Sequence, residues 1–73
     1  MTIESTIRTA LETATLSEAA RSVIETLLAD CRIDEETTAR DLLDVLEDGA
    51  ALAELGLEDQ EAVEDAYGFI ETL

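Results

Sequence analysis

Apolar residues recur along this chain at intervals of three and four positions, and no stretch keeps the two-residue alternation of a half-buried strand. In the first such segment Ile3, Ile7 and Leu11 fall on one stripe, and Val23 and Leu27 share a stripe in the second. This spacing predicts an all-α fold, a bundle of five short helices in a single domain over residues 1–73. The expected helices cover residues 3–14, 16–31, 39–47, 50–55 and 60–72.

Residues typical of helix ends separate these segments. Thr15, followed three residues later by Glu18, has the form of a capping box. Gly49 and Gly56 are expected to end the third and fourth helices, because glycine readily takes the left-handed conformation of a helix C-terminus. The expected N-caps of the second, third and fifth helices are Thr15, Asp34 or Thr38, and Asp59.

The composition is that of a folded chain with an aliphatic core. Its apolar share of 47% is ordinary for a globular domain, so the high charge does not indicate disorder. Tyr67 and Phe69 are the two aromatic residues, which leaves the core to alanine, leucine, isoleucine and valine. Cys31 lies on the apolar stripe of the second expected helix, which favours a buried structural thiol over a nucleophile.

Targeting and membrane signals are not found. No apolar run approaches the roughly 20 residues that span a bilayer. The N-terminal segment, residues 1–4, has neither the basic region nor the apolar stretch of a signal peptide. A lone cysteine cannot form an internal disulfide. These features predict a cytoplasmic protein with no membrane partner.

Negative charge is concentrated in one half of the chain. The sequence holds 19 Asp and Glu against four Arg, with no Lys or His, for a net charge of −15. Residues 1–33 carry a net charge of −2, whereas residues 34–73 hold fourteen acids and one base, Arg40, for a net charge of −13. A fold must place these carboxylates on its surface. The resulting face repels nucleic acid and anionic membranes and attracts basic protein surfaces.

The two halves also differ in how their charges are spaced. In the first half Arg8 lies four residues from both Glu4 and Glu12, a spacing that forms ion pairs on a helix. In the second half the acids fall opposite the apolar stripes of the third and fifth helices, and only Asp44 has a base, Arg40, within one turn. The expected partner-binding residues are Asp41, Asp44, Glu47, Asp48, Glu58, Glu61, Glu64 and Asp65, with Phe69 as an apolar anchor among them.

Three explanations account for such an unpaired acidic ridge. The ridge is a binding surface, an adaptation to a saline host in which the Debye length falls to about 3 Å at molar salt, or an ordinary solvated face. Salt adaptation would spread acids over all exposed faces, and residues 1–33 do not show this. The asymmetry therefore favours a binding surface.

Catalysis and specific metal binding are not expected. An EF-hand loop counted from Asp44 has Gly49 at its sixth position, but Leu46 and Leu55 stand third and twelfth, where the motif needs oxygen ligands. The chain has no His or Lys, and every acid is expected on an exposed face or at a helix cap, so no pair of carboxylates in contrasting environments is formed. We expect no enzyme activity, no metal and no cofactor.

Small acidic helical proteins include the acyl and peptidyl carrier proteins, and this chain is similar to them in composition. That family carries phosphopantetheine on a serine in an Asp-Ser-Leu-like motif at the start of its second long helix. Here Ser17 stands in a Leu-Ser-Glu context, and no serine follows Ser22. This resemblance implies a carrier-like domain as a minor alternative.

The segment Leu52-Ala-Glu-Leu-Gly-Leu57, followed by an amphipathic helix, resembles the end of sterile-alpha-motif domains. It is also similar to half of a helix-hairpin-helix DNA-binding element, which presents basic residues and backbone amides to phosphate. The residues that follow it here, Glu58, Asp59 and Glu61, would repel phosphate. The first resemblance implies a helical adaptor or homo-oligomerisation module, whose acids serve solubility or salt adaptation.

Taken with the charge asymmetry, these features predict a non-enzymatic acidic binding protein whose carboxylates dock on a basic protein surface. Duplex DNA carries one charge per about 1.7 Å of its axis, and two carboxylate-lined helices can imitate part of such a row. In this sharper form the chain is a nucleic-acid mimic, similar in size and charge to phage anti-restriction and anti-CRISPR inhibitors. The expected partner is then a protein that binds nucleic acid, and we expect no direct binding of nucleic acid by this chain. The sequence is also compatible with a homodimer.

Overall fold

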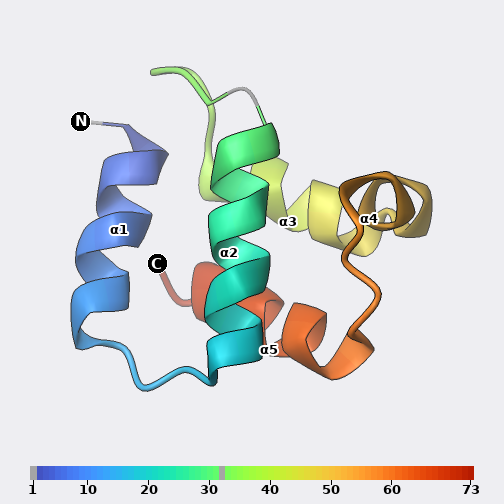
Figure 1. The fold of residues 1–73 in the computed structure, drawn as a ribbon. Helices are drawn as coiled ribbons and strands as arrows, with labels where there is room; N and C mark the ends of the chain where they lie inside the picture. Colours follow the sequence, from blue (N-terminus) through green and yellow to red (C-terminus); the bar gives the residue numbers. More distant parts are fainter. Residues whose placement is uncertain (1, 32) are drawn as a thin grey trace.

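A computed structural model describes residues 2–31 and 33–73 of the chain (Figure 1). Within them lie five helices and no strand, which confirms the all-α prediction. The start of the expected connection at Arg32 lies outside the described residues. The helices are α1 (Ile3–Thr13), α2 (Glu18–Asp30), α3 (Ala39–Glu47), α4 (Gly49–Leu55) and α5 (Gln60–Glu71).

The helices of the two halves meet at α5. In Figure 1, α1 and α2 run in opposite directions, and α5 lies crosswise at the lower end of α2. Helix α5 packs against both α2 and α3, and α4 packs against α3. The last helix therefore joins the nearly neutral N-terminal half to the acidic C-terminal half.

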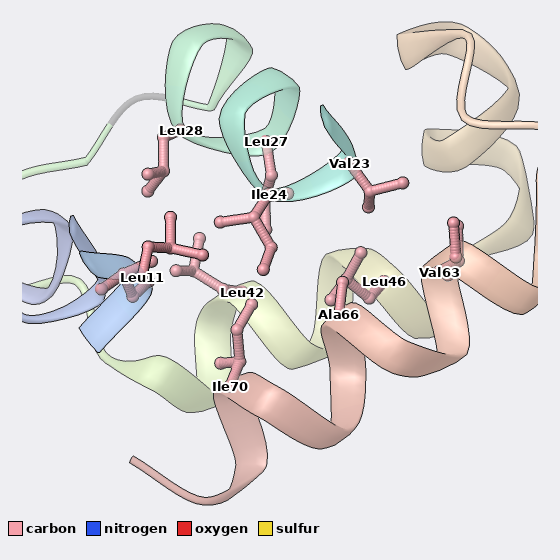
Figure 2. Close-up of a cluster of buried hydrophobic side chains, with 12 residues drawn as sticks. Leu11, Val23, Ile24, Leu27, Leu28, Leu42, Leu46, Val63, Ala66 and Ile70 are labelled. Atoms are coloured by element: carbon pink, nitrogen blue, oxygen red, sulfur yellow. The ribbon is translucent and has the colours of Figure 1, made fainter. Parts of the chain in front are cut away.

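The core is aliphatic and is built from α1, α2, α3 and α5. Ile24 and Leu27 of α2 are fully buried and point between Leu42 of α3 and Ile70 of α5 (Figure 2). Burying a side chain of this size contributes roughly 1.5–3 kcal/mol, so these contacts are the main source of stability. No polar side chain is buried in the described part of the chain. The acids are thus all left to the surface.

The start of α2 differs from the prediction. Ser17, not Thr15, is the N-cap, and its Oγ accepts a hydrogen bond from the backbone N of Ala20 at 3.3 Å. Leu16 precedes the helix in an extended connection, yet its side chain packs against the core. The apolar periodicity placed Leu16 in the helix because it records which side chains are buried and not the backbone conformation.

The boundary between α3 and α4 also differs. Asp48 ends α3, with its backbone N donating to Asp44 O at 3.1 Å, and it begins α4, with Oδ1 accepting from Ala50 N at 3.1 Å. Gly49 is the first residue of α4, so the expectation that it ends α3 was wrong. Gly56, at the end of α4, is the one described residue in the left-handed region, at φ 75°.

The other helix ends agree closely with the sequence. Helix α3 has the expected bounds, and Thr38 and Asp59 are the N-caps of α3 and α5. Helices α1, α2 and α5 each end one residue before the expected position. The residues over-assigned to them, Ala14, Cys31 and Thr72, are their C-caps.

Candidate partner-binding surface

The acidic residues expected to bind a partner all lie on the surface. Phe69, the expected apolar anchor, is half-buried against the edge of the core. Its ring is therefore partly occupied by packing within the chain. The eight exposed carboxylates belong to Asp41, Asp44, Glu47, Asp48, Glu58, Glu61, Glu64 and Asp65.

Cations do not neutralise these carboxylates within the described chain. The single ion pair among residues 2–31 and 33–73 joins Arg8 Nη2 to Glu4 Oε1 at 3.4 Å, in the N-terminal half. Arg40 is exposed and forms no ion pair there with Asp44, the one pairing that the spacing allowed. None of the eight carboxylates is therefore paired with a cation in the described part of the chain.

Two of the eight carboxylates hold helix starts. Asp41 Oδ2 accepts hydrogen bonds from the backbone N of Thr38 at 2.9 Å and from the Thr38 hydroxyl at 3.3 Å. Asp48 caps α4 through Ala50 N. A carboxylate at a helix N-terminus satisfies free N–H groups and complements the helix dipole. Helix capping is sufficient to explain Asp41 and Asp48.

Five of the six remaining acids line hollows at the surface beside α5. Glu61 and Asp65 lie beside Ser17 and Ala19 at the start of α2, in a depression of about 260 Å³. Glu47, Glu58 and Glu64 lie at the edges of a groove, and Glu64 is three residues from Glu61 on the exposed face of α5. Asp44 belongs with this second group, near Tyr67.

The groove runs between α4 and α5 and ends against the last turn of α3. Leu46, Leu52 and Val63 line its first part, which has a volume of about 430 Å³. A second hollow of about 380 Å³ continues it past Leu57 and shares Leu52, Gln60 and Val63 with the first. Its lining is mainly aliphatic and its edges are acidic.

The turn after α4 builds one wall of this groove. Leu57 N donates to Leu52 O at 2.9 Å, and Gly56 N donates to Ala53 O at 3.2 Å. These two hydrogen bonds form a Schellman motif, which commonly brings together apolar residues before and after the left-handed glycine. Here those residues are Leu52 and Leu57. The Leu-x-x-Leu-Gly-Leu pattern indicated the helix end, but not the groove, because α5 supplies the other wall.

Tyr67 lies at the α3 end of the groove and was not among the predicted site residues. Its hydroxyl donates a hydrogen bond to Glu47 Oε1 at 2.8 Å and so links α5 to α3. This bond raises the pKa of Tyr67, with smaller contributions from partial burial and from the charges of Glu47, Glu71 and Asp44. The pair is 20 residues apart in sequence, so no local pattern could reveal it.

Cys31 differs from the prediction of a buried thiol. It is half-buried at the C-cap of α2 and packs against the core edge. Partial burial, followed by the neighbouring charge of Asp30, raises the pKa of the thiol above its ordinary value. The thiol therefore stays protonated near neutral pH, where it is a weak nucleophile.

Neither a metal-ion cluster nor a membrane-spanning helix is found among the described residues. No three His, Cys, Asp or Glu side chains within residues 2–31 and 33–73 gather into a set that could hold a metal ion. Nor is any helix in that part of the chain long and apolar enough to cross a bilayer. Comparisons with protein-family models, curated proteins and solved structures gave no match. The candidate surface is defined by its own geometry: exposed carboxylates without ion pairs among the described residues, and an apolar groove between α4 and α5.

Proposed function

We propose that this protein is a non-enzymatic binding protein whose acidic surface docks on a basic surface of a partner protein. One observation carries the proposal: among the described residues, the six expected site carboxylates that do not cap a helix are exposed and form no ion pair. A basic surface is the partner that such carboxylates attract most strongly.

The cost of this arrangement supports a functional reason for it. Asp44 and Glu47 on α3, and Glu61 and Asp65 on α5, are like charges three or four residues apart. Each such pair destabilises a helix by about 0.2–0.5 kcal/mol. Small domains are stable by only about 5–15 kcal/mol, so several repulsions are a noticeable loss. A cationic partner would convert that loss into binding energy.

In its sharper form, the proposal is that the protein imitates nucleic acid and inhibits a nucleic-acid-binding protein. The exposed acids Glu61, Glu64 and Asp65 along one face of α5 support this form, because duplex DNA also presents closely spaced negative charges along its axis. Binding of this kind would be fast and steeply dependent on salt, since electrostatic steering is screened by ions.

A helical adaptor or homo-oligomerisation module is the second candidate, and the apolar groove beside α5 favours it. Such a module would bind through apolar contact, with the acids serving solubility. Its affinity for a partner would change little with salt, whereas that of the acidic binding protein would fall by orders of magnitude.

The test is a charge reversal with a matched control. The variant D44K/E61K/D65K changes three expected site residues, and the control E12K/E25K/D30K changes three exposed acids of the N-terminal half. Each triple replaces three negative charges by three positive ones and takes the net charge from −15 to −9. Immobilised wild type captures the partner from host lysate at low salt, and the affinity of the purified partner is then measured for all three proteins.

We expect D44K/E61K/D65K to lose binding by at least about 100-fold, a magnitude reached by several close charge pairs. The control should bind nearly as wild type does, and both triples should keep the helical circular dichroism spectrum. Equal binding by the two triples would show that net charge alone matters, and unchanged binding by the first would refute the proposal. Affinity that does not fall with salt would favour the adaptor.

A further inference from the structure

We propose that the groove between α4 and α5 is the docking site for a basic amphipathic helix of the partner protein. The apolar side of that helix would pack on Leu52 and Val63, and its Lys and Arg side chains would pair with Glu47, Glu58 and Glu64 at the groove edges. This inference rests on the proposed function and adds the kind of partner segment and the place where it binds.

The lining of the groove indicates an apolar contact. Leu52 belongs to both parts of the groove and is half-buried, and Leu57 extends the same wall. The two hollows share Leu52, Gln60 and Val63, so they adjoin each other between α4 and α5. Each has a volume within or near the roughly 300–1,000 Å³ of pockets that bind ligands. Together the two hollows have room for more than one anchoring side chain.

The charge around the groove indicates which kind of molecule could bind in it. Glu47 and Glu64 stand at its α3 end and Glu58 at the other, and all three are exposed. A second copy of this chain would bring the same sign of charge to these edges, since the protein carries −15. Anionic lipid and nucleic acid are disfavoured for the same reason. A cationic segment with apolar anchors would pair with the acids at the edges of the groove and pack against its apolar lining.

The architecture favours a helical segment over an extended one. An extended peptide binds most readily by adding a strand to a sheet edge, and residues 2–31 and 33–73 contain no strand. A helix laid in a groove presents anchors at positions i, i+3 or i+4, and i+7 along one face. Basic residues beside that face, toward the two ends of the helix, would reach the acids at both ends of the groove.

The Tyr67–Glu47 hydrogen bond contributes to this geometry. At 2.8 Å it holds the Glu47 carboxylate at the α3 end of the groove. A fixed carboxylate loses less side-chain entropy on pairing with a cation than a mobile one does. The bond thus prepares one acidic edge for a basic side chain.

The experiment uses a labelled synthetic helix of about four turns, ~14 residues. It carries leucines at i, i+3, i+4 and i+7 and lysines on both flanks. Two control peptides are used. The first contains the same leucines and lysines, but they are dispersed around the helix so that it has no apolar face. The second keeps the leucine positions and has glutamates in place of the lysines. Binding to the full chain is followed by fluorescence anisotropy at low salt.

The protein variants are Ala53→Trp and Ala50→Trp, both exposed positions on α4. Ala53 lines the groove and Ala50 does not, so the two changes are matched in size and helix but differ in place. Tryptophan at residue 53 fills the groove. We expect it to weaken binding of the amphipathic peptide by about tenfold or more, against less than about twofold for A50W. Circular dichroism checks that each variant folds.

A second measurement does not depend on any variant folding. Titration of the isotope-labelled wild type with the amphipathic peptide should shift the amide signals of Leu52, Gln60 and Val63 most. Three results would each refute the groove as the docking site while leaving the proposed function standing. These are shifts spread over the acidic surface, equal binding of the dispersed peptide, and equal affinities of A53W and A50W for the amphipathic peptide. If neither lysine peptide binds at low salt, both the groove and the charge-driven function fail.

Discussion

The carboxylates of the second half lie in three different environments. Asp41, Asp48 and Asp59 accept hydrogen bonds from backbone N–H groups at helix starts. Glu47 accepts a hydrogen bond from a phenol, and Glu64 is exposed beside the groove. A carboxylate that caps a helix is explained by the fold, whereas an exposed one without a partner is free to bind. The candidate surface is therefore smaller than the count of acids indicates.

Tyr67 offers a direct measurement at this scale, because it is the chain's only tyrosine and no tryptophan overlaps its absorbance. The hydrogen bond to Glu47 raises its pKa above the ordinary value of 10.0. Ionisation would break that bond and place two negative charges side by side. We expect Glu47→Gln to move the pKa of Tyr67 back down, as read from tyrosinate absorbance during a pH titration. Glu54→Gln removes the same charge from an exposed position on α4 and should leave the pKa of Tyr67 nearly unchanged.

The pH dependence of stability follows from the direction of this shift. A phenol whose pKa is higher in the folded than in the unfolded state favours folding while it is protonated in both. That contribution is fully present below about pH 10 and is lost as the pH rises through the pKa of the folded protein. Thermal melts on either side of that range should show a larger loss of stability for wild type than for E47Q.

The tyrosinate titration has its own contradicting outcome. Identical titration curves for E47Q and E54Q would mean that overall charge, not the hydrogen bond, sets the pKa of Tyr67.

Among the elements, α4 depends most on its ends. None of its seven described residues is buried, and isolated helices of this length are marginal in water. Asp48 holds its start, and the left-handed Gly56 ends it in the Schellman motif. Because α4 forms one wall of the groove, these two caps also determine the shape of the candidate site.

The glycines provide a matched pair of substitutions for testing this dependence. Gly56 has φ 75°, which an alanine would adopt at a cost of about 1–2 kcal/mol, so G56A should lower the free energy of unfolding by that amount. Gly68 lies within α5, and a Cβ there would meet nothing within 4 Å. G68A should raise the free energy of unfolding by about 0.5–1 kcal/mol. Urea denaturation measures both. Destabilisation by G68A would contradict the helical geometry of α5, and a neutral G56A would contradict the left-handed cap.

At the scale of the whole molecule, both halves of the chain contribute to the core, but only one of them carries most of the charge. The core joins α2 to α3 and α5, whereas a net charge of −13 is carried by residues 34–73 alone. The molecule measures 30 × 26 × 18 Å, so many of these charges lie within a few Debye lengths of one another at physiological salt. Their mutual repulsion opposes the packing that the aliphatic core favours.

Salt should therefore act on folding and binding in opposite directions. We expect molar KCl to raise the melting temperature by several degrees, the shift that corresponds to roughly 1 kcal/mol in a domain of this size. D44K/E61K/D65K should gain less, because much of the repulsion has been removed. Partner binding by wild type should weaken over the same range of salt. A melting temperature that does not respond to KCl would contradict the repulsion, and a chain that folds only in KCl would point to adaptation to a saline host.

The five helices, the caps at Asp59 and Gly56, and the exposure of the acids follow from the sequence by itself. They depend on interactions within about one helical turn and on the periodicity of apolar residues, both of which are local. For α3 the sequence left Asp34 and Thr38 as alternative caps, and the structure shows Thr38. The double role of Asp48 and the start of α2 at Ser17 were missed because neighbouring residues could serve equally well as caps. The groove and the Tyr67–Glu47 hydrogen bond were decided only by the tertiary structure. Both features depend on how helices that are distant in sequence pack against each other. Aliphatic side chains can fill a core in many arrangements, so the local sequence does not specify the angle at which two helices cross.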